Sequence, residues 1–312
     1  MKYALSTNWC NRRIETGEEI ADLAGEMGFD ALELGFHTSQ QQVAGFKARL
    51  DKMPVGSVHA FCPVPISAPC GYPELYLLAD PDEEARKMAS LQVRRNIEFA
   101  AEMGASTVVL HAGHVSFSSW LFHVDTQALN AIFAKGGNDV GNARYAQMCA
   151  KALKRRAKAG AARLDVFRRE LETLVPALEQ HQVTLALENL PYLEGFPNCS
   201  ELATLLSGDL KGAPVKGWFD TGHDRVQETH GWKSGTEIHD LKAFAEAFYV
   251  GMHLNDVVDF YDDHLPPGEG KVDFAALKPF AEAVRHVVFE PNSSVTREAL
   301  EKGLAHIRGL WA

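Results

Sequence analysis

Cysteines are few in this sequence, and their placement excludes two kinds of structure. The five cysteines stand at positions 10, 62, 70, 149 and 199, an odd number without any Cys-x-x-Cys pair. A disulfide-stapled secreted domain and a thiolate metal site both require paired or closely spaced cysteines. We therefore expect reduced thiols, a cytoplasmic location and no metal ligand among the cysteines.

Long apolar runs and an excess of basic residues are also missing. No apolar run of the sequence reaches the ~18–20 residues that a membrane-spanning helix needs. The first residues turn polar too soon for a signal peptide and indicate a first strand instead. Lysine and arginine number 31 against 41 aspartates and glutamates, which gives a net charge of −10. Because nucleic-acid backbones require a basic surface, a nucleic-acid partner is disfavoured, and no membrane partner is expected.

What the sequence does contain is a regular succession of short apolar runs. They are rich in valine, leucine and aromatic residues, and polar residues stand mostly at their C-terminal ends. This pattern is typical of parallel strands that are buried on both faces. The eight runs are Lys2–Asn8, Asp30–Phe36, Val55–Phe61, Ser106–Gly113, Val183–Glu188, Val215–Asp220, Tyr249–Asn255 and His286–Glu290.

Helical patterns alternate with these runs. They cover Glu15–Met27, Ser39–Lys52, Asp80–Met103, Leu164–Gln180, Ser200–Ser207, Thr236–Phe248, Phe274–Val284 and Thr296–Leu310. Gly28 and Gly104 each stand just before a strand, where a helix-ending glycine is expected. Eight strand–helix alternations without a linker predict a (β/α)8 TIM barrel that occupies residues 1–312 as a single domain. A doubly wound sheet is the alternative, and it is disfavoured because no glycine-rich phosphate turn follows the first strand.

One connection is much longer than the others. About seventy residues separate the fourth and fifth predicted strands, so residues 115–160 form an insertion. A long loop after a barrel strand lies over the barrel mouth, which predicts a lid or an oligomer arm. The apolar stretch Trp120-Leu-Phe122 offers a contact for a homo-oligomer.

Metal-ligand residue types stand at the ends of the predicted strands. The strand ends supply His59, His111, Glu188, Asp220, His253 and Glu290, and the loops beyond them supply His223, Asp262 and His264. In a barrel these side chains converge at one rim, where buried carboxylates cost several kcal/mol unless a cation neutralises them. Imidazole and carboxylate without thiolate suit Zn²⁺ or Mn²⁺, and also Co²⁺ or Fe²⁺. A metal at Glu188, Asp220, His253 and Glu290 is the main prediction, whereas His59 and His111 are either ligands or substrate contacts.

Other polar residues near strand ends have a simpler interpretation. We expect the histidines His37, His114, His123 and His230 to be hydrogen-bonded structural residues. Glu33, in Leu32-Glu-Leu34, is expected to cap a loop, although the second strand also ends at the rim.

Several short motifs together resemble one family. They are Leu187-Glu-Asn-Leu, Phe219-Asp-Thr-Gly-His, His253-Leu-Asn-Asp, Asp262-Asp-His-Leu-Pro-Pro-Gly-Glu-Gly-Lys-Val-Asp-Phe274 and Phe289-Glu-Pro. The chain looks like the xylose isomerase-like barrel superfamily, which includes sugar isomerases and epimerases as well as endonuclease IV. The resemblance implies a divalent metal held by the four residues named above.

The ketose 3-epimerase branch of that superfamily implies a reaction. There the glutamates that correspond to Glu188 and Glu290 flank the sugar and exchange its proton through a metal-stabilised enediolate. The resemblance places His223 on a substrate oxygen and makes Glu194 a substrate contact. The predicted substrate is a sugar, a sugar phosphate or a similar polyol. Val257-Val-Asp-Phe replaces the arginine of those epimerases, so the exact substrate is not implied.

The alternative is a metal-dependent phosphoesterase that resembles endonuclease IV. All nine of its ligand positions have counterparts, in the sets His59, His111 and Glu188; Glu188, Asp220, His253 and Glu290; and His223, Asp262 and His264. The acidic chain, the lack of an obvious basic rim and the long insertion disfavour DNA as the substrate. A barrel that binds a ligand without converting it is disfavoured because both the presumed acid and the presumed base are present.

Overall fold

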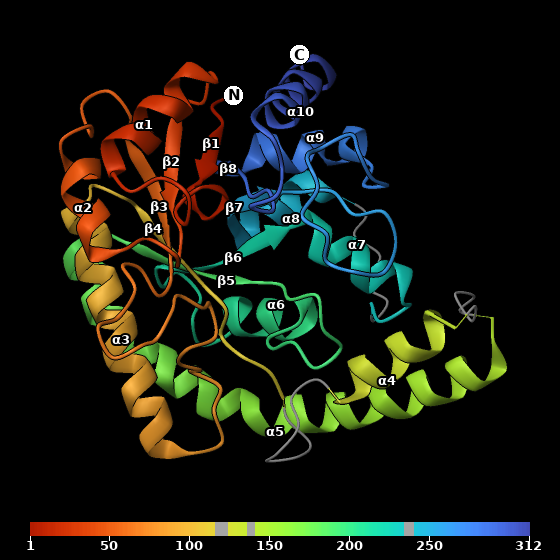
Figure 1. Ribbon diagram of the computed structural model, residues 1–312. Helices are drawn as coiled ribbons and strands as arrows, with labels where there is room; N and C mark the ends of the chain where they lie inside the picture. Colours follow the sequence, from red (N-terminus) through yellow and green to blue (C-terminus); the bar gives the residue numbers. More distant parts are fainter. Residues whose placement is uncertain (116–123, 136–140, 234–239) are drawn as a thin grey trace.

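The computed structural model describes the whole chain except residues 116–123, 136–140 and 234–239 (Figure 1). Eight parallel strands form a closed barrel in which each strand pairs with the next and β8 pairs with β1. The predicted (β/α)8 barrel is thereby confirmed, and each strand lies within its predicted run. The strands are β1 Ala4–Ser6, β2 Ala31–Leu34, β3 Val55–His59, β4 Thr107–Leu110, β5 Thr184–Glu188, β6 Val215–Asp220, β7 Tyr249–Leu254 and β8 His286–Phe289.

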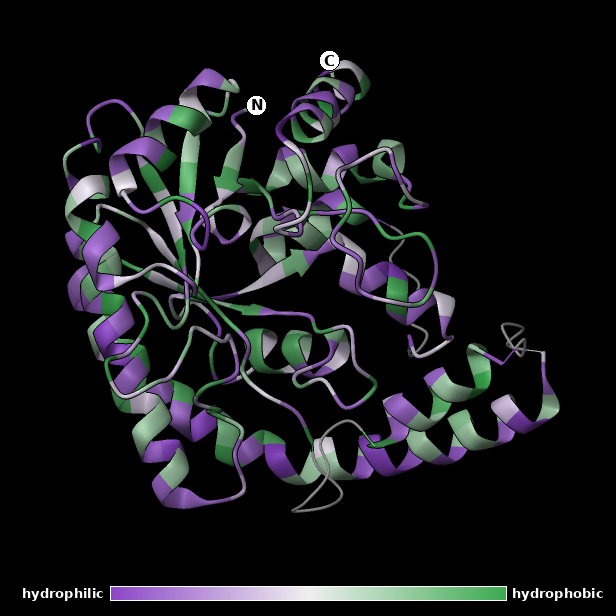
Figure 2. Cartoon of the chain, viewed as in Figure 1, coloured by the Kyte–Doolittle hydropathy of each residue, from purple (hydrophilic) through white to green (hydrophobic). Residues whose placement is uncertain are grey.

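Helices surround the barrel. They are the 3₁₀ helix η1 Thr7–Trp9 and the α-helices α1 Gly17–Glu26, α2 Gln40–Lys47, α3 Glu83–Glu102, α4 Val124–Phe133, α5 Ala143–His181, α6 Cys199–Ser207, α7 Thr221–Thr229, α8 Leu241–Phe248, α9 Phe274–Ala283 and α10 Arg297–Leu310. Gly28 and Gly104 follow α1 and α3 with φ values of 89° and 72°, which confirms that they end these helices. The helices are banded in purple and green in Figure 2, as expected for amphipathic helices with one face on the barrel.

The sequence patterns missed three helical segments. α4 and the first half of α5 lie in the predicted insertion, and α7 starts directly after β6. α5 has 39 residues, whereas the pattern predicted only its last part. Its start is fixed by Asn142, whose side-chain oxygen accepts hydrogen bonds from the backbone amides of Arg144 and Tyr145. The predicted start of a helix at Thr236 lies outside the described residues.

A buried layer fills the barrel interior. Trp218 is fully buried there and packs with small and β-branched residues of other strands. Gly251 on β7 makes room for the indole, because a Cβ at this position would lie 2.1 Å from the Trp218 ring. A packed interior closes the barrel below its rim, so chemistry is confined to the C-terminal ends of the strands.

The described part of the insertion forms a helical arm. α4 and the first half of α5 run side by side and project beyond the barrel (Figure 1). The arm has its own apolar cluster, in which Phe133 and Tyr145 pack against Trp232 and Phe260 from loops at the barrel rim. The helical arm is therefore anchored beside the rim. Its roles as a lid or in oligomerisation stay predictions, and Trp120-Leu-Phe122 lies outside the described residues.

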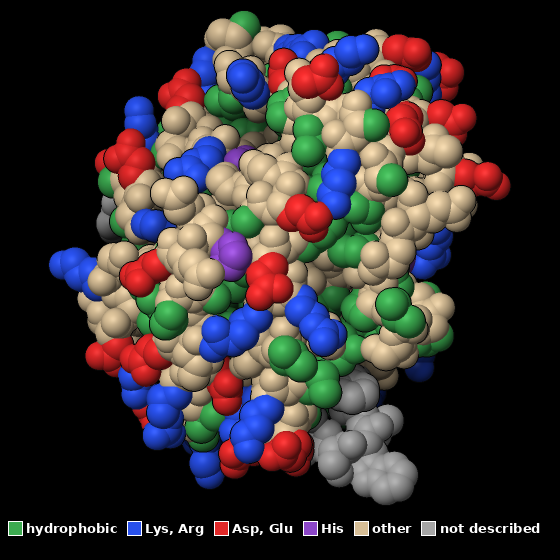
Figure 3. Space-filling model, turned by 90° about the vertical axis from the view of Figure 1, so that its left-hand side faces the viewer, with side chains coloured by type: hydrophobic (Ala, Val, Ile, Leu, Met, Phe, Trp, Pro, Cys, Tyr) green, Lys and Arg blue, Asp and Glu red, His purple; other side chains and the backbone are tan. Residues whose placement is uncertain are grey.

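Charges of both signs are mixed on the face of the molecule that Figure 3 shows. On the face drawn in Figure 3, lysine and arginine side chains are interspersed with aspartate and glutamate. Among the described helices, none has the length and apolar character required to cross a bilayer.

Candidate metal centre

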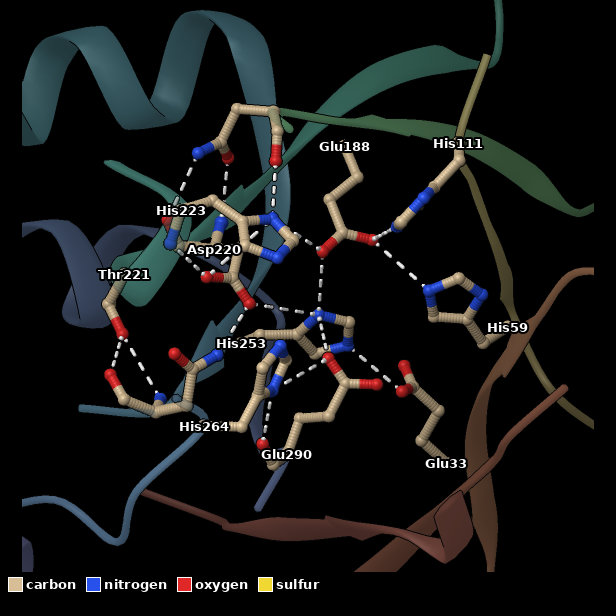
Figure 4. Close-up of polar contacts among 12 residues, drawn as sticks. Glu33, His59, His111, Glu188, Asp220, Thr221, His223, His253, His264 and Glu290 are labelled. Carbon is tan, nitrogen blue, oxygen red and sulfur yellow. Dashed lines mark hydrogen bonds and ion pairs between the residues drawn. The ribbon is translucent and has the colours of Figure 1, made fainter. Parts of the chain in front are cut away.

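The rim of the barrel gathers all nine predicted ligands into three adjoining groups. Figure 4 labels all of them except Asp262. Within each group, one ligand atom per residue lies within 4.8 Å of the others. The groups are Glu188, Asp220, His253 and Glu290 (the four-ligand group); His59, His111 and Glu188 (the His59 group); and His223, Asp262 and His264 (the His223 group). The sequence prediction that these side chains share one site agrees with their placement.

The four-ligand group is centred on His253. Its Nδ1 lies 3.1 Å from Oε1 of Glu188, 3.1 Å from Oε2 of Glu290 and 3.6 Å from Oδ2 of Asp220. All four side chains are buried, the most exposed being Glu290 at 6%. Three carboxylates packed this closely away from water repel one another unless a cation lies among them.

The His59 group shares Glu188 with the four-ligand group. Nε2 of His59 lies 3.2 Å from Oε2 of Glu188, and Nε2 of His111 lies 3.3 Å from the same atom. This oxygen is buried and makes no hydrogen bond, although two imidazole nitrogens stand close to it. An unsatisfied buried carboxylate oxygen between two imidazoles fits a cation bound by all three side chains. Glu188 thus directs one oxygen toward each of two groups.

The His223 group lies at the outer side of the rim. Nε2 of His223 and Nε2 of His264 lie 3.3 Å and 3.1 Å from Oδ2 of Asp262. His264 has a backbone φ of 48°, a left-handed conformation that is costly for a residue with a Cβ. The turn therefore holds the His264 ring in place next to Asp262.

Four of the five candidate ligand histidines turn one ring nitrogen toward the centre and anchor the other on a protein acceptor, whereas Nδ1 of His111 makes no hydrogen bond to another described residue. These anchoring contacts are His59 Nδ1 with Ala60 O at 3.0 Å, His223 Nδ1 with Asn189 O at 2.7 Å, His264 Nδ1 with Glu290 O at 2.8 Å and His253 Nε2 with Glu33 Oε1 at 2.9 Å. This is the arrangement of metal-ligating histidines, in which the outer N–H bond fixes the ring and its tautomer.

Asp220 is positioned by its own helix and by two neighbouring strand ends. It is the N-cap of α7, where its Oδ1 accepts a hydrogen bond from the backbone amide of His223 at 2.7 Å. Asn255 donates to Oδ2 of Asp220 at 2.7 Å. Gly222 permits this contact, because a Cβ there would lie 1.9 Å from Oδ1 of Asn255. The motifs Asp-Thr-Gly-His and His-Leu-Asn-Asp are therefore joined at the site.

The glycine-rich part of the Asp262–Phe274 motif has a structural role. Asp256 is buried and accepts hydrogen bonds from the backbone amides of Val257, Gly268, Gly270 and Val272 at 2.8–3.0 Å. A Cβ on Gly270 would lie 2.4 Å from Oδ1 of Asp256, so glycine is required at this close approach. One carboxylate thereby fixes the loop that follows Asp262 and His264.

Burial and neighbouring charges shift the pKa values of the ligand side chains. Burial favours the neutral form of His111, but the carboxylates of Glu188 and Glu74 together outweigh burial and raise the pKa of His111 to about 10. Burial also acts to lower the pKa of His223, yet Asp220 and Asp262 raise it to about 9. His111 and His223 are therefore protonated at neutral pH and lie next to carboxylates. A divalent cation would displace these protons on binding.

Two glutamates near the site make contacts that the sequence did not predict. Glu194, expected to contact substrate, accepts hydrogen bonds from the backbone amides of Asp125 and Thr126 and from the Thr126 hydroxyl, so it caps the start of α4. Substrate binding by Glu194 stays a prediction. Glu33, expected to cap a loop, instead contacts His253. Its position within the buried run Leu32-Glu-Leu34 was the available signal.

A comparison of the sequence with protein families agrees with the barrel fold described above. A sequence model of the xylose isomerase-like TIM barrel family matches residues 21–310. The chain belongs to this family. A search of curated proteins gave no match.

Several solved structures share the fold over nearly their whole length. One is described as a D-tagatose 3-epimerase-like protein, with 20% identity, a TM-score of 0.64 and 100% of both chains covered. A second is the 3-keto-D-glucoside 4-epimerase YcjR from E. coli, with 18% identity, a TM-score of 0.65 and 99% coverage of both chains. A third is a Thermus thermophilus protein soaked with ZnCl2, with 21% identity, a TM-score of 0.60 and coverage of 99% and 98%. At these identities the likeness establishes the fold.

Proposed function

We propose that the protein is a divalent-metal-dependent isomerase or epimerase of a sugar, a sugar phosphate or a similar polyol. The observation that carries the proposal is the four-ligand group, in which Glu188 and Glu290 approach His253 from different strands. The family membership and the structural likeness to sugar epimerases support the same reaction class.

The residues can be given roles from their positions. Glu188 ends β5 and Glu290 follows β8, and Figure 4 shows them on opposite sides of the His253 ring. A sugar bound between them would have one carboxylate on each face of the reacting carbon, so that one glutamate removes the proton and the other returns it. A Zn²⁺ or Mn²⁺ ion held by the four-ligand group would stabilise the negative charge of the enediolate that forms. His223 would contact a substrate oxygen.

Deuterium exchange tests this proposal. Metal-loaded protein is incubated with a panel of ketoses, sugar acids and sugar phosphates in D₂O, and exchange at the carbon next to the carbonyl is followed by NMR. We expect exchange with at least one substrate, abolished by Glu290→Gln, which also weakens metal binding. If the panel gives no exchange while phosphodiesters are cleaved, the isomerase function is wrong.

One observation favours a second candidate, a phosphoesterase with two or three metal ions. Glu188 offers separate oxygens to the four-ligand group and to the His59 group, and Asp262 contacts two further imidazoles. Several adjacent cations would clamp a phosphate and activate water. Elemental analysis separates the candidates: one ion per chain supports the isomerase, whereas two or three ions together with phosphoester cleavage support the hydrolase.

A further inference from the structure

A cavity opens directly beside the metal centre. It has a volume of about 190 Å³, and its lining includes Asn8, Arg12, His37, His264 and Glu290. Since a water molecule takes up about 30 Å³, the cavity has room for a substituent of several heavy atoms. A substrate whose reacting carbon lies at Glu290 could therefore extend one end into this space.

Arg12 brings an uncommitted positive charge to the cavity. Its side chain is exposed, and across the described ranges no hydrogen bond or ion pair engages its guanidinium. The adjacent Arg13 differs, because it donates to the backbone oxygen of Ser293 and its guanidinium lies 4.8 Å from the centre of the Trp9 ring. Arg13 therefore holds the loop that carries Arg12, and Arg12 is left available for a ligand.

The remaining polar groups of the cavity do not cancel this charge. Asn8 donates to Oε1 of Glu290 at 3.1 Å and accepts from the backbone amide of His37 at 3.2 Å, so its amide is fixed between them. Glu290 is also engaged by His253 at 3.1 Å. Burial, with a smaller contribution from Arg12, lowers the pKa of His37 to about 4, which leaves its imidazole neutral at physiological pH. The positive charge of Arg12 is thus the one free charge among these groups.

We propose that this cavity binds an anionic end group of the substrate, a carboxylate or a phosphate ester, with Arg12 as its ionic partner. The inference rests on the proposed function and narrows its substrate class to sugar acids or sugar phosphates. A guanidinium presents a planar pair of N–H donors that matches both anions, and an exposed side chain can close over a ligand from the rim. Arg12 would determine specificity and take no part in proton transfer.

Binding measurements on the metal-loaded protein test the proposal. Calorimetry compares two matched pairs of probes, gluconate with sorbitol and glycerol 3-phosphate with glycerol, on wild type, Arg12→Ala and Arg12→Lys. Lys87→Ala removes one positive charge from an exposed part of α3 and serves as the control. Metal content and thermal unfolding are checked first, so that a loss of binding cannot come from a loss of fold.

The expected result is a change confined to the anionic probes. Arg12→Ala should weaken binding of at least one anion about tenfold, as for loss of a charge-assisted hydrogen bond, and should leave the neutral probes unchanged. Arg12→Lys should recover part of the affinity, and Lys87→Ala should bind like wild type. Anions held by the metal alone would bind equally well to Arg12→Ala, and that outcome overturns the proposal. If gluconate binding depends on Arg12, the cavity takes a carboxylate. If glycerol 3-phosphate binding depends on Arg12, it takes a phosphate.

The exchange assay keeps this inference separate from the proposed function. If ketoses exchange deuterium but Arg12→Ala leaves anion affinity unchanged, the cavity assignment is wrong and the isomerase stands. If anion binding depends on Arg12 while no sugar on the panel exchanges and phosphodiesters are cleaved, the cavity assignment stands and the isomerase is wrong.

Discussion

Oε1 of Glu33 lies 2.9 Å from Nε2 of His253, and both side chains are completely buried. The other oxygen of Glu33 accepts a hydrogen bond from the Ser57 hydroxyl at 2.8 Å. β2 and β3 thus hold a carboxylate that fixes the ring of a proposed ligand on β7. Such a carboxylate–histidine pair sets the tautomer and raises the basicity of the nitrogen that faces a metal.

Glu33→Gln should therefore weaken metal binding without removing any ligand. The amide keeps the shape of the side chain but loses the charge, and loss of an outer partner of a metal-bound histidine typically costs about 10–100-fold in affinity. Competition with a chelator measures the change, and Ser57→Ala is the matched control because it removes only the contact to the distant oxygen. Equal affinities in wild type and Glu33→Gln would show that Glu33 does not position His253.

The shared carboxylate of Glu188 leads to a prediction about metal stoichiometry. If an ion binds at the His59 group, the double variant His59→Ala, His111→Ala should lose that ion and keep the one held by the four-ligand group. Elemental analysis after dialysis should then give about one ion per chain fewer than wild type. The control is Asp262→Asn, which acts only on the His223 group. A metal content unchanged by the double substitution would place His59 and His111 among the substrate contacts.

The residues at the strand ends could be predicted as ligands because most of the buried apolar runs carry a carboxylate or an imidazole at or near their C-terminal end. Runs such as Val215–Asp220 are mostly apolar and end on a metal-ligand residue type, and parallel pairing brings all such last residues to one rim. Six candidate ligands at strand ends could be named on this basis, with three more in the loops beyond them, and the structure brings all nine together. Their division into three groups was implied by the resemblance to endonuclease IV rather than by the strand pattern.

Contacts between side chains of distant strands could not be predicted in the same way. Glu33 was taken for a loop cap because its sequence neighbourhood gives no sign of His253, which is 220 residues away in the chain. Glu194 was named as a substrate contact from the resemblance to the 3-epimerases, and its hydrogen bonds to the start of α4 could not be foreseen because α4 was not predicted. A local pattern specifies an element and its ends, whereas partners between elements depend on tertiary packing.

His230 should make the protein less stable in mild acid. Its ring is buried, stacks on Trp232 with 4.0 Å between ring centroids, and meets the hydroxyl of Tyr145 at 2.9 Å. Burial lowers the pKa of His230 to about 4, whereas an unfolded histidine titrates near ~6.5. The unfolded state therefore takes up the proton first, and stability falls as the pH drops from about 6.5 toward about 4.

Urea unfolding of wild type and His230→Phe at pH 7.5 and pH 5 measures this contribution. Phenylalanine keeps the stacked ring and cannot be protonated, so the loss of stability between the two pH values should be smaller in the variant by about 2 kcal/mol. Other histidines titrate equally in both proteins and cancel in the comparison. The same pH dependence of the free energy of unfolding in both proteins would show that His230 does not cause the loss of stability in acid.

The connection between the arm and the barrel depends on Arg156 of α5. This side chain is buried, donates to both carboxylate oxygens of Glu201, and also donates to the backbone oxygen of Gly195 at 2.6 Å. A Cβ on Gly160 would lie 2.0 Å from Oε1 of Glu201, so glycine is needed for the ion pair to form. Removal of one partner from a buried ion pair leaves an uncompensated charge, which is costly.

Arg156→Met should therefore lower the free energy of unfolding by about 3–5 kcal/mol, because Glu201 and the Gly195 carbonyl lose their donor. Arg169 provides a matched control on α5, since it pairs with Asp165 and both side chains are 61% exposed. Exposed pairs contribute about 0–1 kcal/mol, so Arg169→Met should be nearly neutral. Urea denaturation gives both values, and similar losses for the two variants would mean that the Arg156 pair does not anchor the arm.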